Sequence, residues 1–398
     1  MTKKSDAPAI RFKGFSDAWE QRKFEEIAVR SSVICSDDTL PRVEYEDIVS
    51  GTGRLNKDIY AKQSIKSGIA FHQGDVLYGK LRPYLQNWLL PTFDGLAVGD
   101  FWVLQPQNAD SSFLYRLIQS RQFDEVANQS TGTKMPRADW KLVSKTVFSI
   151  PSNISEQAAI GTYFTALDSL ITLHQRKFEK LTNVKKSMLE KMFPQNGSSY
   201  PEIRFKGFTD PWEQRKLGDI ADIVGGGTPS TGNQSYWDGD IDWYAPAEIA
   251  DQIYANSSQK KITGLGYENS SAKMLPPGTV LFTSRAGIGK TAILTRKGCT
   301  NQGFQSIVPH RGELDSYFIF SRTEELKRYG ELVGAGSTFV EVSGKQMAVM
   351  ELMMPPTMRE QQTIGGFFQQ LDHLITLHQR ELEQLQSIKK ALLEKMFV

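Results

Sequence analysis

The sequence of 398 residues has no long apolar run, and it has few cysteines. No segment reaches the roughly 20 uncharged apolar residues of a membrane helix. The polar N-terminus, Met1 to Asp6, lacks the apolar core of a secretory signal. The only two cysteines, Cys35 and Cys299, can form neither a disulfide framework nor a zinc ribbon. These absences argue against a membrane or secreted protein and predict a reduced cytoplasmic compartment.

The chain also has almost no net charge. It carries 47 Lys and Arg residues against 45 Asp and Glu residues, a balance of +2. Residues 29–150 contain 14 basic and 13 acidic side chains, and residues 222–354 contain 12 and 14. Bulk charge therefore neither indicates nor excludes a nucleic-acid partner, and only a clustered basic face would do so.

Catalytic motifs are missing as well. The sequence contains no Gly-x-Ser-x-Gly elbow, no His-Glu-x-x-His zinc site, no Asn/Asp-Pro-Pro-Tyr/Phe methylation site and no convincing Pro-Asp…Glu-x-Lys nuclease cluster. The five histidines are too scattered to suggest a catalytic cluster: His72, His174, His310, His373 and His378. We therefore expect no catalysis and no metal site in this chain.

One segment is similar to the end of a phosphate-binding P-loop. Gly287 to Thr291 reads Gly-Ile-Gly-Lys-Thr after an expected strand. The motif also needs a glycine five positions before Gly289, and that residue is Ser284. ATP binding is therefore a minor alternative.

The chain contains two internal repeats, and they define its organisation. Residues 10–28 and 203–221 are identical at 14 of 19 positions, and residues 155–193 and 359–397 at 23 of 39. Between these constant ends lie two strongly diverged segments, residues 29–150 (body 1) and residues 222–354 (body 2). Simple duplication with drift would erode ends and middle alike. Constant ends around variable bodies indicate that the ends share one geometry or partner, while the two bodies have different functions.

Residues 155–193 and 359–397 each predict one long helix, because seam side chains recur at alternating steps of four and three residues. In the first helix one seven-residue gap is filled by Lys185. The seam residues that we expect to pair the helices are Ile160, Phe164, Leu167, Ile171, His174, Phe178 and Leu181 in the first helix, and Ile364, Phe368, Leu371, Ile375, His378, Leu382 and Leu385 in the second.

Two such helices in one chain can bury each other's apolar stripe. If the two repeats are related by a pseudo-twofold axis, the helices run antiparallel. Each helix would be about 55–60 Å long, which matches about 16 base pairs of DNA. His174 and His378 are the midpoints of the two repeats. We interpret them as a polar pair that fixes the register rather than as a metal site, because no further ligand is nearby.

The two bodies predict compact α/β modules with mixed, mostly antiparallel sheets. Body 1 shows short strands at 75–78, 101–104 and 145–150 and a helix at 112–121. Body 2 shows strands at 241–244, 279–283, 291–295, 305–308 and 347–353 and a helix near 316–327.

Polar and basic residues follow equivalent strands in the two bodies. Arg and Lys pair with guanine edges or phosphates, and Ser and Thr suit either. A solvated surface charge is the simpler interpretation for each residue, but recurrence at equivalent loops favours binding. The candidate DNA-contacting residues are Lys80, Arg82, Tyr84, Thr133, Lys134 and Arg137 in body 1, and Ser284, Arg285, Lys290, Ser337 and Thr338 in body 2.

With this layout the sequence resembles the specificity (S) subunits of Type I restriction–modification systems, over residues 10–397. The resemblance is carried by the paired leaders Arg-Phe-x-Gly-Phe-x-Asp-x-Trp-Glu-Gln-Arg-Lys-Phe/Leu at 11–24 and 204–217. The second set is the pair of helices that end in Leu-Glu-Lys-Met-Phe.

The resemblance implies an α+β protein with two target recognition domains, two long antiparallel coiled-coil helices and a pseudo-twofold repeat. Each recognition domain would read one half of a split DNA sequence. The helices would set the unread spacer and dock two methylation subunits. Those partners would bring S-adenosylmethionine, and restriction subunits would bring ATP-driven, Mg-dependent cleavage. The chain itself would hold no cofactor.

The domain boundaries that we expect follow from the repeats. We expect a flexible tail before the first recognition domain and a linker between the first helix and the second recognition domain. The ranges are 1–9 (tail), 10–154 (recognition domain 1), 155–193 (helix 1), 194–202 (linker), 203–358 (recognition domain 2) and 359–398 (helix 2). The alternative to DNA recognition is a scaffold that joins two other binding modules through a coiled coil. The sequence leaves open the target bases, the spacer length and the partner stoichiometry.

Overall fold

The computed structural model describes residues 8–61, 64–129, 134–195, 197–250, 252–285, 287–335 and 341–397. The chain divides into two compact units, and each long helix contributes a part to both. Unit 1 comprises residues 1–176 and 379–398, and unit 2 comprises residues 177–378. The expected boundaries treated the helices as separate segments, whereas each compact unit contains one body together with parts of both helices.

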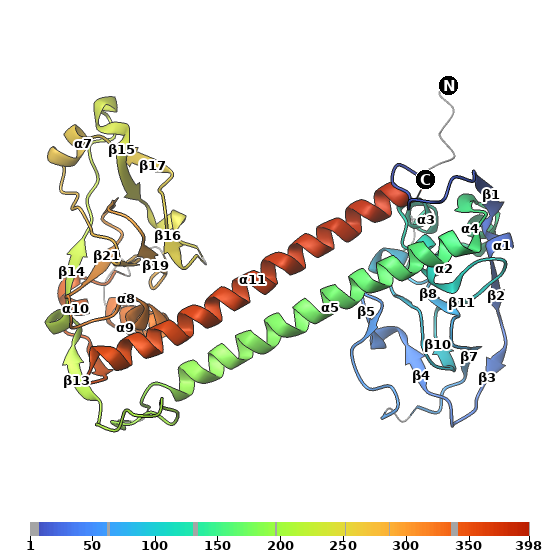
Figure 1. Cartoon of the computed structure of the whole chain (residues 1–398), viewed down its shortest axis with the longest axis horizontal. Helices are drawn as coiled ribbons and strands as arrows, with labels where there is room; N and C mark the ends of the chain where they lie inside the picture. The colour runs from blue at the N-terminus through green and yellow to red at the C-terminus, as the bar shows by residue number, and fades with distance from the viewer. Residues whose placement is uncertain are drawn as a thin grey trace. The chain divides into compact units, whose positions relative to one another are not determined.

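Body 1 contains two small four-stranded sheets (Figure 1). The first is antiparallel throughout, and its order is β2 (Ala28–Ser31), β11 (Phe101–Pro106), β8 (Val76–Gly79) and β9 (Trp88–Leu89). The second has the order β3 (Ile34–Cys35), β7 (Gly68–Phe71), β10 (Gly95–Val98) and β4 (Arg42–Glu44), with β10 and β4 parallel. A short hairpin joins β5 (Ile48–Val49) to β6 (Arg54–Leu55).

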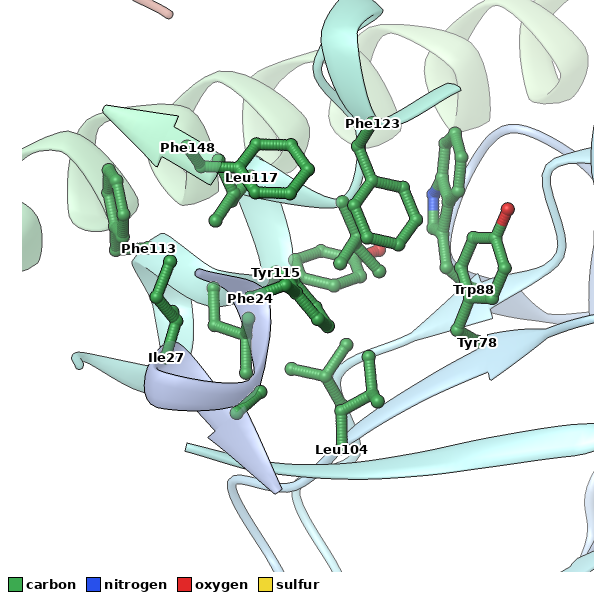
Figure 2. Close-up of a cluster of buried hydrophobic side chains, with 14 of the residues drawn as sticks. Phe24, Ile27, Tyr78, Trp88, Leu104, Phe113, Tyr115, Leu117, Phe123 and Phe148 are labelled. Atoms are coloured by element: carbon green, nitrogen blue, oxygen red, sulfur yellow. The ribbon is translucent and has the colours of Figure 1, made fainter. Parts of the chain in front are cut away.

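Short helices cover the first sheet of body 1. They are α1 (Phe24–Ile27), α2 (Ser111–Leu117), α3 (Arg121–Ala127) and α4 (Trp140–Lys145). The expected helix at 112–121 is two helices, because Ser120 caps a new helix start by accepting a hydrogen bond from the Phe123 amide. Between helices and sheet lies an aromatic-rich core that includes Phe24, Tyr78, Phe113, Phe123 and Phe148 (Figure 2). Phe24, Phe123, Phe148 and Tyr78 meet one another edge-to-face or tilted, as aromatic pairs prefer.

Body 2 has a larger, mixed sheet system. A five-stranded sheet has the order β14 (Ala221–Gly225), β21 (Gln305–Pro309), β18 (Val280–Phe282), β19 (Thr291–Leu294) and β16 (Tyr254–Ala255). A three-stranded sheet has the order β17 (Lys260–Ile262), β15 (Trp237–Tyr244) and β20 (Cys299–Thr300). The helices are α6 (Leu217–Ile220), α7 (Gly264–Glu268), α8 (Ser316–Ser321), α9 (Thr323–Gly334) and α10 (Gly344–Ala348).

Each leader forms a strand that pairs with the strand just before a long helix. In unit 1, β1 (Trp19–Lys23) pairs antiparallel with β12 (Val147–Pro151). In unit 2, β13 (Glu213–Lys216) pairs antiparallel with β22 (Glu351–Met354). The expected strand at 347–353 therefore begins late, because its first residues end helix α10. In each unit the strand before the body and the strand after it therefore lie side by side.

The long helices are α5 (Ile154–Lys191) and α11 (Met358–Met396), within a residue or two of the predicted bounds. The seam side chains nearest to the start of each helix are buried, at 7% exposure or less: Ile160, Phe164, Leu167, Ile364, Phe368 and Leu371. The remaining expected seam residues are half-buried: Ile171, His174, Phe178, Leu181, Ile375, His378, Leu382 and Leu385.

Within each unit the two helices also make ionic contacts. In unit 1, Asp168 of α5 binds Lys389 of α11 at 2.7 Å, and His174 lies 3.0 Å from Glu381. Since positions rise along one helix as they fall along the other, these segments run antiparallel. In unit 2, Lys185 binds Asp372 at 2.6 Å. The seam gap at Lys185 is thus occupied by a cross-helix ion pair.

Candidate functional site

Each leader clamps the start of the long helix in its own unit. In unit 1, the Arg11 guanidinium donates to both carboxylate oxygens of Glu156 at 2.6 and 2.7 Å, and the Trp19 indole donates to the same carboxylate at 3.3 Å. Glu156 is only 1% exposed. Its hydrogen bond raises the pKa of Arg11 above the usual value. The clamp is a bidentate ion pair with a third donor, in which the carboxylate is buried and the guanidinium is part-buried.

Unit 2 repeats this clamp with the equivalent residues. Arg204 donates to both oxygens of Glu360 at 2.7 and 2.9 Å, and Trp212 donates to it at 3.2 Å. Glu360 is also 1% exposed. The invariant Arg and Trp of the two leaders, and the Glu of the two helices, are therefore partners. This explains why these parts of the repeats stayed alike while the bodies diverged.

A second shared contact fixes each body on its helix. The Gln157 side chain accepts from the Asp110 amide at 2.9 Å, and the Gln361 side chain accepts from the Asp315 amide at 3.0 Å. Asp110 and Asp315 in turn cap α2 and α8. Glycine is required at Gly161, because a Cβ atom there would lie 1.8 Å from the Ser112 hydroxyl oxygen. Both bodies are therefore mounted on the helix starts in the same way.

We expect Glu156→Ala to lower the free energy of unfolding by about 2–3 kcal/mol, because the charge-assisted hydrogen bonds from Arg11 and the one from Trp19 are lost. Glu360→Ala should have an effect of the same size in unit 2. Denaturant unfolding followed by tryptophan fluorescence measures both effects.

The control for these two variants is Glu20→Ala. Glu20 forms an exposed ion pair with Arg22, and such pairs contribute about 0–1 kcal/mol. Equal losses for Glu20→Ala and Glu156→Ala would show that the clamp has no special energetic role.

Among the predicted contact residues of body 1, Lys80 and Arg137 are held together by one acid. Lys80 lies 3.5 Å and Arg137 3.1 Å from Asp100. Burial acts to raise the pKa of Asp100, but its contacts with Arg137 and Lys80 outweigh burial and lower that pKa. Both cations are therefore partly neutralised. Lys134 is exposed, and Thr133 lies outside the described residues.

Arg82 and Tyr84 form the most distinctive projection of body 1. The short helix η2 (Pro83–Leu85) lies between Arg82 and Gln86, which both adopt left-handed backbone conformations, with φ of 49° and 54°. For a non-glycine residue such a conformation costs about 1–3 kcal/mol of folding free energy, and such conformations cluster at functional sites. Tyr84 is 57% exposed and Arg82 is also exposed. A strained turn that presents a cation and an aromatic ring fits a binding role.

In body 2 the predicted residues are only partly at the surface. Ser284 is fully buried, so the expected surface position is wrong for this side chain. Arg285 is half-buried and Lys290 is exposed, whereas Ser337 and Thr338 lie outside the described residues. Lys290 precedes strand β19 and not a helix. The segment therefore lacks the helix N-terminus on which a P-loop holds phosphate.

Sequence reasoning missed a set of charged residues at the junction of body 1 and the helices. Arg116 of α2 donates to Asp168 at 2.6 Å, on the same carboxylate that binds Lys389. In unit 2 the equivalent carboxylate, Asp372, accepts instead from the Tyr317 hydroxyl at 2.9 Å. The repeated Lys-Lys pairs at 185–186 and 389–390 are the sequence signal that could have indicated these contacts.

Among the described residues, no helix combines the length and apolarity needed to cross a bilayer. Comparison with known proteins finds the same protein family in both halves of the chain. The family described as the Type I restriction modification DNA specificity domain matches residues 32–183 and again residues 209–387. The two matches together cover all but three residues of body 1, the whole of body 2 and most of both long helices.

Individual relatives carry the same description. The MjaIX specificity subunit of a Type I restriction enzyme from Methanocaldococcus jannaschii is 35% identical over 190 residues, 47% of this chain and 44% of the relative. The HindI specificity subunit of Haemophilus influenzae is 21% identical over 372 residues, 74% of this chain and 78% of the relative. In the first of these matches the chain spans less than half of its relative.

A solved structure has the same fold. The S subunit of a Type I restriction–modification system from M. genitalium aligns with a TM-score of 0.65 and 13% identity, over 98% of this chain and 99% of that one. Because the family matches cover most of the sequence, the chain belongs to the Type I restriction–modification DNA specificity domain family and carries two copies of that domain.

Proposed function

We propose that the chain is the DNA sequence-specificity subunit of a Type I restriction–modification complex in the cytoplasm. Each body reads one half of a split DNA sequence, and the chain itself is not catalytic. The observation that carries this proposal is the pair of equivalent clamps, Arg11–Glu156 and Arg204–Glu360, beneath two dissimilar bodies. Two different bodies that are attached to their helices by the same contacts are what we expect if both bodies bind DNA but recognise different sequences.

In this proposal the long helices form an antiparallel coiled coil with pseudo-twofold symmetry and act as a ruler. The helices have 38 and 39 residues, which gives about 57 Å and 58 Å, or about 17 base pairs of duplex. The Asp168–Lys389 and Lys185–Asp372 pairs support equivalent pairing in the two units. The helices thereby set the unread spacer between the half-sites.

We further propose that the outer faces of the helices dock two methylation subunits, which recruit restriction subunits. Equivalent leucines on the two helices are at least 40% exposed: Leu170, Leu173, Leu374 and Leu377. Apolar residues at helical spacing that remain exposed suit a partner helix. The partners supply S-adenosylmethionine, ATP and Mg, and this chain supplies the sequence specificity.

A methylation map tests the proposed function. The chain is co-expressed with its methylation subunit in a host that lacks DNA methylation, and the genome is sequenced for methyladenine. We expect one split motif with an unread spacer. A complex that assembles, binds no DNA and methylates none would instead support the scaffold alternative.

The projection on body 1 makes a more local prediction. Arg82→Ala and Tyr84→Ala should each weaken binding to the mapped target by about 1–3 kcal/mol, because one base-edge or stacking contact is lost. Fluorescence anisotropy of labelled duplexes measures this. Arg22→Ala and Tyr60→Ala are matched controls, since both residues are exposed or nearly so and lie outside the projection. Equal binding by all four variants would remove the projection from the DNA interface.

A further inference from the structure

Unit 1 contains a cavity of about 1020 Å³ where body 1 meets the helices. One wall is the turn at residues 51–54 between β5 and β6, and a second is formed by α2 and α3. A third wall combines residues 165–176 of α5 with residues 386–394 of α11, and residues 86–92 around β9 complete the lining. All of these segments belong to the same unit.

The lining of this cavity has six basic and three acidic residues, and one of the cations, Arg121, is paired at 2.7 Å with a further acid, Glu125. Three of its residues are acidic, namely Asp124, Asp168 and Glu394, and the charge of Asp168 is already shared by two cations. Arg54 is bound by the neutral Gln175 side chain at 2.9 Å. The cavity therefore has an excess of positive charge. Its six basic residues are Arg54, Arg116, Arg121, Arg176, Lys389 and Lys390.

Arg116 is the buried centre of this arrangement. Its side chain is 2% exposed, and its Nε has no hydrogen-bond partner among the described residues. The side-chain nitrogen of Gln119, which also lines the cavity, has none either. These two nitrogens have almost no exposed surface, so a ligand in the cavity would instead meet the exposed cations of the lining, Arg176 and Lys390.

Body 2 mounts its helix differently at the equivalent place. Asp372 accepts from the neutral Tyr317 hydroxyl, whereas Asp168 accepts from the Arg116 guanidinium. The guanidinium is therefore specific to the contact of body 1 with its helix. It is not part of the mounting that both units share.

We infer that this cavity binds phosphate groups of the DNA backbone beside the half-site read by body 1. The inference rests on the proposed function, because it places the spacer DNA along the helices. Guanidinium, ammonium, hydroxyl and amide donors are the usual partners of backbone phosphates. The α5 wall from Thr165 to Arg176 is about 16 Å long, which equals the rise of about five base pairs. These contacts position the duplex without reading its sequence.

The test uses the full chain assembled with its methylation subunit. The variant Arg176→Gln/Lys390→Gln removes two exposed cations of the cavity. The control variant Lys177→Gln/Arg380→Gln removes two exposed cations of the same helices that do not line it. DNA binding is measured across a salt series, on the mapped target and on a scrambled duplex.

We expect the cavity variant to weaken binding to both duplexes equally. Each phosphate contact contributes about 0.9 to the slope of log affinity against log salt, so that slope should become shallower by about 2 for this variant. The control variant should keep the wild-type slope, and the methylated motif should not change. Wild-type binding with an unchanged slope in the cavity variant overturns this inference and leaves the proposed function intact.

Two further measurements distinguish DNA from the other anions that could occupy the cavity. Titration calorimetry with inorganic phosphate compares the wild type with the cavity variant. If phosphate binding is lost while DNA binding stays unchanged, the cavity serves free phosphate and the DNA assignment is overturned. If size-exclusion chromatography shows that only the cavity variant fails to join the methylation subunit, the occupant is an acidic segment of that partner. No DNA binding and no methylation by the wild type would instead refute the proposed function.

Discussion

A chain in which a copy of body 2 replaces body 1 is expected to direct its methylation subunits to an interrupted palindrome. The graft exchanges residues 29–150 for residues 222–354. Under the proposed pseudo-twofold, two identical bodies read the same half-site in opposite orientations. The half-site formerly read by body 1 should disappear from the methylation map, and the spacer should keep its length.

The structure shows that the graft junctions are equivalent. The residue before each body is a buried alanine, Ala28 or Ala221, and the residue after it is Pro151 or Pro355. The clamps lie outside the exchanged segments, so Arg11–Glu156 is retained. The substitution therefore changes the body and leaves its base in place.

The contact between body and helix also transfers. The grafted copy of Tyr317 would meet Asp168, which is the repeat equivalent of its present partner Asp372. Lys389 would still bind Asp168, as Lys185 binds Asp372 in unit 2. The graft does remove Arg116 and with it the cationic cavity of unit 1. Weaker binding that depends less on salt, with an intact palindromic motif, is the expected secondary effect.

The reciprocal chain, with body 1 in both places, is the matched control and should direct methylation to the other palindrome. A folded graft that kept the original asymmetric motif would show that the bodies do not carry the specificity. A motif changed in both halves would show that the bodies are not independent modules.

The long helices and the repeat could be predicted from the sequence, and the reason is local. The three- and four-residue steps from Ile160 to Leu181 describe one helix face, and prolines mark where the chain turns. The seam therefore predicted the side chains that are buried near the start of each helix, whereas its later residues are only half-buried. In that pattern Lys185 only filled a gap between apolar residues. Its ion pair with Asp372 could not be predicted, because the sequence of two helices does not show which of their residues lie side by side.

The candidate site was harder to predict, because it is made by segments that are distant in sequence. Arg11 and Glu156 are 145 positions apart, and each looked like part of a separate repeat. Ser284 follows a strand in the same way as Lys80, but burial depends on packing from other elements. The cavity at Arg116 combines a turn, two short helices and two long ones. No periodic pattern within a single segment encodes such a combination.

Lengthening both long helices by four residues is expected to lengthen the unread spacer by one to two base pairs and to leave both half-sites unchanged. Four residues add about 6 Å to a helix, and one base pair adds about 3.4 Å to a duplex. A four-residue insertion is a stutter, which a coiled coil absorbs by local unwinding. The methylation map measures the spacer directly.

The insertions belong after Arg176 and after Arg380. These positions lie midway along each helix between the Asp168–Lys389 pair and the Lys185–Asp372 pair, so both ion pairs keep their register. The control carries the insertion in α5 alone. It shifts one helix by about one turn against the other, so the two pairs cannot both form, and the assembled complex should lose methylation. If the single insertion methylated as well as the double one, the helices would not act as a paired ruler. An unchanged spacer in the double insertion would mean that some other part of the complex sets the distance between the half-sites.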